Sequence, residues 1–455
     1  MSPSKTLCII LAILMLLASI SMVVDSKNET CNSNIYFTKT PHYSHQPIHI
    51  HGNQEFTIEN GVTSGSGTSE DPYLIERWDI ISDGFSSAGV IIEETTVPFI
   101  LCNCTISGFN QREFCAVNFI DVNSASIINV ESFNNFNGIR IDQSSNIVVM
   151  NCINHDNFGK NDYYAGIDGF SAYSSNHISF ITCESFRNRN NRFPYDLASG
   201  FGFYNSTFCL VENSISYDNQ GCGIYLIHST SDVVIRNCSL YNNWGCGVYA
   251  NVERLRISNC TILQNGRIAN NGAAGIYLTG DFNILENSVI SGGYGNGVDT
   301  LHDENIIRNC TIDNHPHKAG ISIAQSYGTL VEHCIISKCE VGISCYLSLR
   351  IQILWNVLES NTYGITTIFN QIGEFVTLRI HSNYIMNNSI FGLQLSPWTF
   401  ADARKNWWGS LQGPTRGLIR HGDALSTQRF CLCLYRPWAR SLIPDSGFSP
   451  NEYKN

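Results

Sequence analysis

A column of tyrosines is the first feature of this sequence that could do chemistry. A glycine followed by an apolar, a variable and a second small or apolar residue recurs along the chain, as in Gly223-Ile224-Tyr225-Leu226. In a strand the variable residue alternates with inward apolar neighbours, so it points outward. In chain order the variable residues are Arg140, Asp168, Gly202, Tyr225, Tyr249, Tyr277, Asp299, Ser322, Ser344, Thr366 and Gln394. Three consecutive tyrosines followed by an aspartate could bind sugar rings on their aromatic faces, or could equally well only stabilise a sheet surface.

The densest mixed-charge stretch of the chain is a second candidate region. The glycine spacing lengthens to 34 residues between Gly166 and Gly200, which predicts inserted loops. Insertions on one face of a repeat protein commonly frame its binding site. The polar residues of this stretch are His155, Asp156, Lys160, Asp162, Arg187, Arg189, Arg192, Tyr195 and Asp196.

Short strands at a fixed period must position these residues. From Gly223 onward the glycine units start 22 to 28 residues apart, and a second unit lies between them, in which Asn precedes Cys or Ser. So short a unit cannot bury an apolar face alone, and successive units must stack into a solenoid with parallel strands. Asn side chains at equal positions should then hydrogen-bond along the axis. The second unit occurs at Asn103-Cys104, Asn151-Cys152, Asn213-Ser214, Asn237-Cys238, Asn259-Cys260, Asn287-Ser288 and Asn309-Cys310.

The sequence resembles the right-handed parallel β-helix proteins of the pectin-lyase-like superfamily, which include the NosD-type repeat proteins. The two repeated units carry this resemblance, together with Gly65-Ser66-Gly67-Thr68 and Asp71-Pro72 early in the chain and Asn406-Trp407-Trp408-Gly409 late in it. The resemblance implies an all-β, right-handed parallel β-helix solenoid of about a dozen coils with a C-terminal cap. We expect a signal peptide or N-terminal anchor at 1–26, an initial segment and N-terminal cap at 27–74, the β-helix at 75–409, and the C-terminal cap and tail at 410–455.

The resemblance also bears on catalysis. Enzymes of this superfamily that cleave acidic polysaccharides pair an Arg or Lys base with carboxylates, sometimes with calcium. Asp168, Asp196 and Arg192 resemble such a set in kind, although their spacing matches no family motif. A polysaccharide lyase or hydrolase with its site beside the inserted loops at 154–200 would therefore use these residues, and calcium if it is a lyase. No other cofactor or metal is expected.

The cysteines and histidines raise the question of disulfide bridges and of metal sites. Seven of the 18 cysteines occupy the same place in successive units, which predicts an interior column of small apolar side chains, unsuited to disulfides because their Cβ vectors are parallel. His42, His45, His49 and His51 lie within ten residues, but a solvent-facing strand explains them better than a copper or zinc site. Most Asn-x-Ser/Thr sequons fall in the Asn-Cys unit and are predicted to be by-products of the ladder, which leaves Asn28 and Asn205 for glycosylation.

Composition and the N-terminal segment limit the kinds of partner that this protein is expected to have. A formal net charge of −11 and a pI near 5.6 disfavour a nucleic-acid partner, because phosphate binding needs a basic stripe that no segment supplies. The uncharged run from Leu7 to Val24 predicts a secreted or cell-surface protein, attached to a membrane only if this segment stays uncleaved.

Four functions are open on the sequence alone. The first is a non-catalytic binder of extracellular glycan or polysaccharide, with Tyr225, Tyr249, Tyr277 and Asp299 as its binding residues. The second is the polysaccharide lyase or hydrolase with Asp168, Asp196 and Arg192. The third, from the resemblance alone, is a NosD-like accessory in copper-site maturation. The fourth is a purely structural surface protein.

Overall fold

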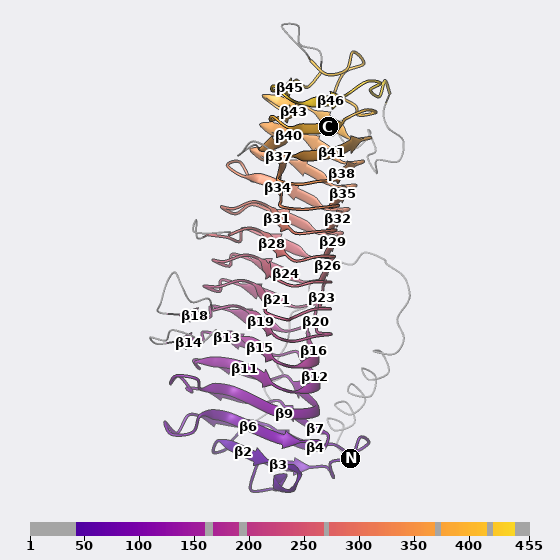
Figure 1. The fold of residues 1–455 in the computed structure, drawn as a ribbon. Coiled ribbons are helices and arrows are strands. Elements are labelled where there is room, and N and C mark those ends of the chain that lie inside the picture. Colours follow the sequence, from indigo (N-terminus) through magenta and orange to yellow (C-terminus); the bar gives the residue numbers. More distant parts are fainter. Residues whose placement is uncertain are drawn as a thin grey trace. The chain divides into compact units, whose positions relative to one another are not determined.

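The predicted solenoid is confirmed. The computed structural model describes residues 42–159, 167–190, 198–267, 273–368, 375–415 and 422–441. These residues wind into successive coils of short strands, stacked from the N-terminal to the C-terminal end (Figure 1). Each full coil contributes one strand to each of three sheets, here called A, B and C. One short 3-10 helix, η1 (Asn53–Glu55), interrupts the strands near the N-terminal end.

Sheet A is a 14-stranded parallel sheet. Its strands are only two to four residues long, because each coil must bend again after two or three side chains. In stacking order they are β1 (Tyr43–Ser44), β5 (Trp78–Ile81), β8 (Thr105–Ser107), β10 (Glu131–Phe133), β13 (Ile153–His155), β17 (Glu184–Phe186), β21 (Ile215–Tyr217), β24 (Ser239–Tyr241), β27 (Thr261–Leu263), β30 (Val289–Ser291), β33 (Thr311–Asp313), β36 (Ile335–Ser337), β39 (Val357–Glu359) and β42 (Tyr384–Met386).

Sheet B contains the strands that follow the repeated glycines. Its outward residues include the three tyrosines described below. Its inward Ile, Val, Leu and Phe side chains are buried. In stacking order the strands are β2 (Ile48–His51), β6 (Ala88–Thr95), β9 (Cys115–Ile128), β11 (Asn137–Asp142), β15 (Phe170–Tyr173), β19 (Phe201–Tyr204), β22 (Ile224–Ile227), β25 (Val248–Ala250), β28 (Ile276–Thr279), β31 (Val298–Leu301), β34 (Ala319–Ala324), β37 (Val341–Tyr346), β40 (Tyr363–Ile368), β43 (Phe391–Leu395) and β45 (Leu425–Thr427).

Sheet C closes each coil, and the long strand β9 pairs in both sheet B and sheet C. All its pairings are parallel except the antiparallel pair β3–β4 at the N-terminal end. In stacking order its other strands are β3 (Val62–Ser64), β4 (Tyr73–Glu76), β7 (Phe99–Cys102), β12 (Ser145–Met150), β16 (Asn176–Ile181), β20 (Leu210–Glu212), β23 (Val234–Arg236), β26 (Arg256–Ser258), β29 (Ile284–Glu286), β32 (Ile306–Arg308), β35 (Leu330–Glu332), β38 (Ile351–Leu354), β41 (Val376–His381), β44 (Thr399–Asp402) and β46 (Leu432–Leu434).

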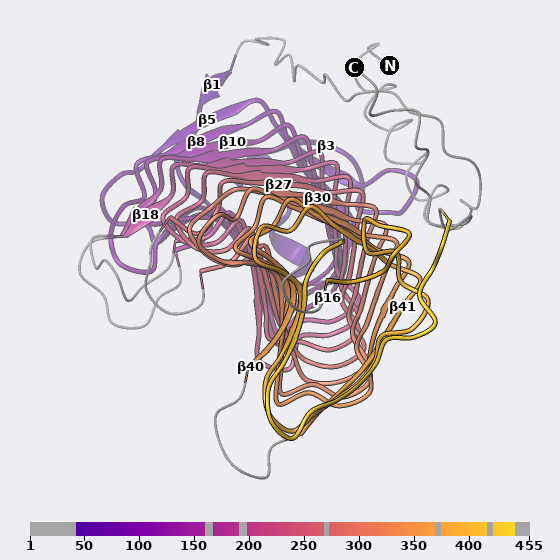
Figure 2. The same ribbon diagram turned by 90° about the horizontal axis from the view of Figure 1, so that it is seen from above.

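Close approach between coils explains the repeated glycine. A Cβ atom on Gly223 would lie 2.6 Å from the carbonyl oxygen of Gly247 in the next coil and 3.1 Å from the buried Nδ2 atom of Asn243. A Cβ on Gly364 would lie 2.4 Å from the carbonyl oxygen of Gly392. Backbone atoms cannot yield to such contacts, so the bend before sheet B favours glycine in most coils, with Ala116 and Ala424 at this position in two others. Viewed along the stack, the coil path turns sharply between sheet A and sheet B (Figure 2).

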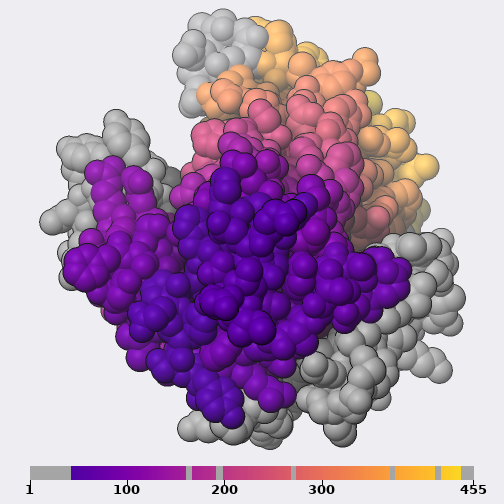
Figure 3. Space-filling view, turned by 90° about the horizontal axis from the view of Figure 1, so that it is seen from below, coloured from indigo at the N-terminus to yellow at the C-terminus, as the bar shows by residue number. Residues whose placement is uncertain are grey.

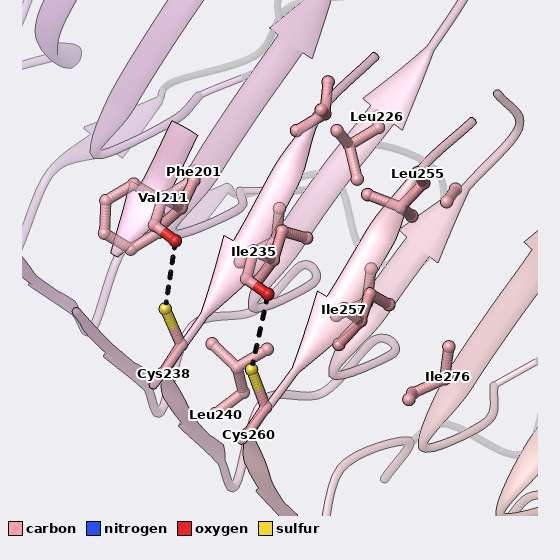
Figure 4. Close-up of a cluster of buried hydrophobic side chains, with 14 of the residues drawn as sticks. Phe201, Val211, Leu226, Ile235, Cys238, Leu240, Leu255, Ile257, Cys260 and Ile276 are labelled. Atoms are coloured by element: carbon pink, nitrogen blue, oxygen red, sulfur yellow. Dashed lines mark hydrogen bonds between the residues drawn. The ribbon is translucent and has the colours of Figure 1, made fainter. Parts of the chain in front are cut away.

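The predicted interior column of cysteines is also confirmed. The seven cysteines of the column are free thiols, and all seven are buried. Cys238 donates from Sγ to the carbonyl oxygen of Val211, 3.5 Å away in the preceding coil, and Cys260 does so to Ile235 at 3.9 Å (Figure 4). The thiols therefore act as small apolar side chains that each satisfy a backbone carbonyl.

The predicted asparagine ladder exists, but in a different column. The Asn of the Asn-Cys unit has a positive φ, for example 56° at Asn237 and 54° at Asn259, and its side chain lies at the surface of the corner between sheets C and A. Asparagine tolerates this left-handed conformation, which is why it recurs there. The buried ladder follows sheet A instead, where each side-chain oxygen accepts from the backbone N–H of the preceding coil, through Asn135, Asn157, Asn188, Asn219, Asn243 and Asn265.

This correction changes the interpretation of the sequons. Asn237, Asn259 and Asn309 were expected to be buried in a ladder, yet all three are exposed. The reason given for discounting them as glycosylation acceptors therefore does not hold. Asn205 is exposed as expected, and Asn28 lies outside the described residues.

The two ends of the stack differ. At the N-terminal end, side chains from the first coils cover the surface (Figure 3), and Phe56 and Val62 close the core beneath them. At the other end β45 and β46 add the last strands of sheets B and C, and Trp408 is fully buried. The role of 410–455 as a cap stays a prediction. The segment 1–26 lies outside the described residues. Among the described residues, no helix is long and apolar enough to cross a bilayer.

Candidate functional site

The outward column of sheet B contains the three tyrosines in the predicted register. Tyr225 of β22 pairs with Tyr249 of β25, Tyr249 pairs with Tyr277 of β28, and Tyr277 pairs with Asp299 of β31. All four residues are partly buried on the outer face of the sheet. The alternation of apolar and variable residues was therefore sufficient to place this strip.

One member of the column was predicted wrongly. Arg140 pairs with Ser171, and Ser171 pairs with Gly202, so Ser171 takes the position that was assigned to Asp168. The cause is the glycine that begins this coil, since Gly169 and not Gly166 aligns with Gly138 and Gly200. Asp168 lies before the strand, in the bend that leads into sheet B.

The tyrosine rings stack on one another. The ring centroids of Tyr225 and Tyr249 are 5.1 Å apart with a 33° interplanar angle, and those of Tyr249 and Tyr277 are 5.2 Å apart at 18°. Both faces of Tyr249 are therefore covered by its neighbours. A sugar cannot lie flat on this ring as the sequence suggested, so a ligand would meet ring edges and hydroxyl groups.

A small buried cluster supports the strip from one side. Cys222, Cys246 and Ala274 pack together outside the main core, and the three tyrosines contact this cluster. Burial raises the pKa of each tyrosine above its ordinary value, so the hydroxyls stay protonated at neutral pH. None of the three hydroxyls is hydrogen-bonded to another described residue, which leaves them available to a ligand.

Asp168 is a buried carboxyl group at the N-terminal side of the strip. It is only 1% exposed, and it accepts a hydrogen bond from the Tyr204 hydroxyl at 2.8 Å and another from the backbone N–H of Ser199 at 3.2 Å. Burial raises the pKa of Asp168 to about 7, although both hydrogen bonds oppose the rise. The group can thus hold or release a proton near neutral pH.

The residues around Asp168 form a packed polar group. Tyr173 stacks on Tyr204 with ring centroids 4.3 Å apart, and the Arg140 guanidinium lies 4.4 Å above the Tyr173 ring. Arg140 Nε also donates to Asp142 Oδ2 at 2.8 Å. The two tyrosines and Arg140 were not identified as a group from the sequence, because they come from three coils and Arg140 belongs to a different column from the tyrosines.

Asp299 continues the strip on the other side. Its Oδ1 accepts a hydrogen bond from Asn296 Nδ2 at 2.6 Å, and burial raises the pKa of its carboxyl group. Asp168 and Asp299 lie five coils apart, roughly 24 Å at the usual strand spacing. The two carboxyl groups therefore cannot act together on one glycosidic bond.

A pocket beside the strip was not predicted from the sequence. It has a volume of about 480 Å³ and is formed by the turns that join sheet B to sheet C in four successive coils. Hydroxyl, amide, imidazole and carboxylate groups line it, including His228, Asn251, Thr279, Asp281 and His302. Asn251 and Thr279 follow the strip by only two residues, so the pocket and the tyrosines form one continuous surface.

His155, Asp156 and Arg187 of the mixed-charge stretch lie in or next to strands of sheet A. Asp196 and Arg192, like Lys160, Asp162 and Tyr195, lie outside the described residues, so their predicted roles stay predictions. Strands β14 (Phe158–Gly159) and β18 (Arg189–Asn190) pair at the base of the insertions. Arg187 forms two hydrogen bonds to Asp156, at 2.8 and 2.6 Å, and His155 stacks on Phe186 on the outer face of sheet A. These residues therefore belong to another face.

The N-terminal histidines lie on a strand that alternates buried and exposed residues. His49 and His51 are exposed on β2, and both contact Glu93, at 2.6 and 3.4 Å. Glu93 is remote in sequence and was not foreseen as a partner. Among the described residues no cluster of three potential ligands could hold a metal ion.

Stacked coils, three parallel sheets and an interior ladder define a parallel β-helix. The family described as "Right handed beta helix region" matches residues 158–267 and 257–407, and the chain belongs to this family. No curated protein matches the sequence significantly.

Solved structures with a similar fold include phage tailspikes. A tailspike double mutant of E. coli bacteriophage HK620 is 10% identical, with a TM-score of 0.51 over 72% of this chain and 69% of that one. Another mutant of this tailspike, in complex with a pentasaccharide, is 10% identical, with a TM-score of 0.50 over 72% and 68%. The Dettilon tailspike is 13% identical, with a TM-score of 0.45, and this chain spans 62% of its length. At these identities the likeness concerns the fold alone.

Proposed function

We propose that this protein binds an extracellular glycan or polysaccharide along the outer face of sheet B. The observation that carries the proposal is the in-register strip of Tyr225, Tyr249 and Tyr277, whose hydroxyls have no partner in the described part of the chain and lie beside a polar pocket. A polyhydroxylated ligand matches a row of groups that can each donate and accept a hydrogen bond.

The rigidity of the strip favours binding. The rings are held by stacking and by the cluster of Cys222, Cys246 and Ala274, so little side-chain freedom remains to be lost when a ligand binds. Tyrosine occupies this column in three successive coils, which suits a ligand that is itself a repeating polymer. The face also continues into the pocket, where further hydroxyl and amide groups are available.

Fold-level analogy is a weaker support. The HK620 tailspike mutant that was solved with a pentasaccharide shares the β-helix architecture. A fold of this kind hosts many functions, so the proposal depends on the residues of the face itself. Secretion or display at the cell surface is proposed from the N-terminal segment 1–26.

Replacing the three tyrosines by phenylalanine tests the proposal. Tyr225→Phe, Tyr249→Phe and Tyr277→Phe together keep the stacked rings and remove only the hydroxyls. We expect glycan binding, measured by calorimetry against a panel of oligosaccharides, to weaken at least tenfold, because each lost hydrogen bond contributes about 0.5–1.5 kcal/mol. The melting temperature should change little.

A matched control is available on another face. Tyr241 stacks on Tyr217 on the outer face of sheet A, with ring centroids 4.9 Å apart. Tyr241→Phe should leave binding unchanged. If the triple variant binds glycan as tightly as the unmodified protein, the strip has only a structural role.

Catalysis is the second candidate, and Asp168 is the observation that favours it. A buried carboxyl group with a pKa of about 7 can act as a general acid at neutral pH, and the Tyr204 hydroxyl fixes its orientation. The reaction would be cleavage of a polysaccharide, with Arg192 and Asp196 as proposed partners. Product analysis by mass spectrometry on the glycans that bind should show fragments with the unmodified protein and none with Asp168→Asn. Binding without any product would exclude this candidate.

A further inference from the structure

Around the tyrosine strip, the aspartates and the arginines differ in whether they form ion pairs. Carboxyl groups lie at both ends of the strip, in Asp168 and Asp299, and two more, in Asp281 and Asp303, lie in or next to the pocket. None of these four groups forms an ion pair within the described residues. Their hydrogen bonds come from uncharged donors, such as the backbone N–H groups of Asp303 to Asp281 and of Tyr327 to Asp303, at 2.9 and 2.8 Å.

The arginines of the same surface are already paired. Arg254 at the pocket donates to both carboxylate oxygens of Asp232, at 2.7 and 2.9 Å, and to Glu253 at 3.1 Å. Arg140 at the other end is paired with Asp142. An acidic ligand would have to break these ion pairs to gain a bidentate arginine contact. Lys318 also attracts the Asp299 carboxylate, which lowers the pKa of Asp299 without offsetting the effect of burial.

At neutral pH the unpaired negative charge of this surface lies chiefly at the pocket, in Asp281 and Asp303, because burial raises the pKa of Asp168 and of Asp299. A uronic acid polymer would bring its own carboxylates close to Asp281 and Asp303, and these like charges repel one another most at low salt. Neutral hydroxyl groups meet no such penalty. Amino groups on a sugar would be attracted to the same two carboxylates.

Resting on the proposed function, we infer that the glycan recognised by sheet B carries no acidic groups and is a neutral or amino-sugar polysaccharide. The feature that selects it is the pair of aspartates without an ion-pair partner in and next to the pocket beside the strip, Asp281 and Asp303. This inference goes against the acidic substrates that the sequence resemblance implied.

Three probes of different charge test the inference on the full chain. Calorimetry would compare cello-oligosaccharides, chitosan oligosaccharides and oligogalacturonates of equal length at low and physiological salt. We expect the oligogalacturonate to bind at least tenfold more weakly than the better of the other two, with a smaller difference at high salt because salt screens the repulsion. A variant with Asp281→Asn and Asp303→Asn keeps the acceptor oxygens and should strengthen oligogalacturonate binding severalfold.

The possible results distinguish a wrong charge preference from a wrong binding face. Oligogalacturonate binding that equals or exceeds the others, and that is lost in the triple Tyr→Phe variant, would overturn the charge inference while sheet B remains the binding face. Binding of any probe that is unaffected by the triple variant would contradict the proposed face itself. If none of the three binds, the proposed function fails, and the charge inference fails with it.

Discussion

Asp168 shows how one residue can alter the behaviour of the whole chain with pH. Its carboxyl group is buried in the bend before sheet B, where two hydrogen bonds do not fully replace the water it has lost. Because burial disfavours the charged form, the pKa of this group rises to about 7 in the folded protein. The same carboxyl group in the unfolded chain ionises near its ordinary value.

The raised pKa predicts that Asp168 destabilises the fold as the pH rises. Between the unfolded and folded pKa values the native state binds the extra proton, so stability falls with increasing pH in this interval and levels off above about pH 7. Asp168→Asn removes this dependence. We expect the variant to gain stability relative to the unmodified protein by roughly 2–3 kcal/mol between pH 5 and pH 8. Urea unfolding at a series of pH values measures the difference.

A pH-independent difference between the two proteins would show that Asp168 ionises normally. Asp299 provides a comparison, because burial also raises the pKa of its carboxyl group. Its carboxylate likewise accepts a hydrogen bond, in this case from the side-chain amide of Asn296. Asp299→Asn should give a difference of the same sign.

At the residue scale the sequence predicted the tyrosine strip and misplaced Asp168. The strip is predictable because Tyr225, Tyr249 and Tyr277 each stand two residues after a glycine that the backbone requires. Around Asp168 two glycines, Gly166 and Gly169, compete for that position, and only the strand register decides between them. The approach of Tyr204 to Asp168 depends on two coils, so no local pattern reveals it.

Buried hydrogen bonds in register stabilise the individual coils. Asn243 Nδ2 donates to the carbonyl oxygen of Ser216 and to Asn265 Oδ1, both at 3.0 Å. Its own Oδ1 accepts from the backbone N–H and the side-chain amide of Asn219. One side chain thus satisfies polar groups of three coils, at the bend where the glycines allow the backbone to pass closely.

Removing one rung of this ladder should be costly. In Asn243→Ala several buried donors and acceptors lose their partners, and we expect the free energy of unfolding to fall by about 3 kcal/mol. Asn259→Gly is the control, since Asn259 is exposed with a φ of 54°, which glycine adopts freely, so the change should be within about 0.5 kcal/mol. Chemical denaturation of both variants measures the contrast. Equal losses would mean that the surface asparagines, as first predicted, form the stabilising ladder.

At the element scale the period was predictable, but the role of each asparagine was not. Asn occurs in most coils at the surface corner, where it adopts a left-handed conformation, and in many coils again in the buried ladder, where it donates and accepts hydrogen bonds. Both columns have the same spacing in the sequence. Cysteine was easier to place, because a column of small apolar residues has no comparable position at the surface.

The molecule as a whole combines a predictable scaffold with an unpredictable surface. Stacking was evident from the repeat, because no single unit could bury its apolar side chains. The pocket of about 480 Å³ was not, because its lining comes from the turns of four coils, whose residues do not repeat. The balance of charge is also a property of the assembled surface, since Arg254 and Asp232 pair across coils and leave Asp281 without a cation.

The most direct test of the central claim is to locate a bound glycan on the surface. Hydroxyl-radical footprinting with mass spectrometry, carried out with and without a saturating amount of the best-binding oligosaccharide, reports the solvent access of each tyrosine. Glycan binding on sheet B predicts that Tyr225, Tyr249 and Tyr277 become protected, while Tyr217 and Tyr241 on sheet A react as before. Protection of the sheet A tyrosines with no change at the strip would contradict the claim.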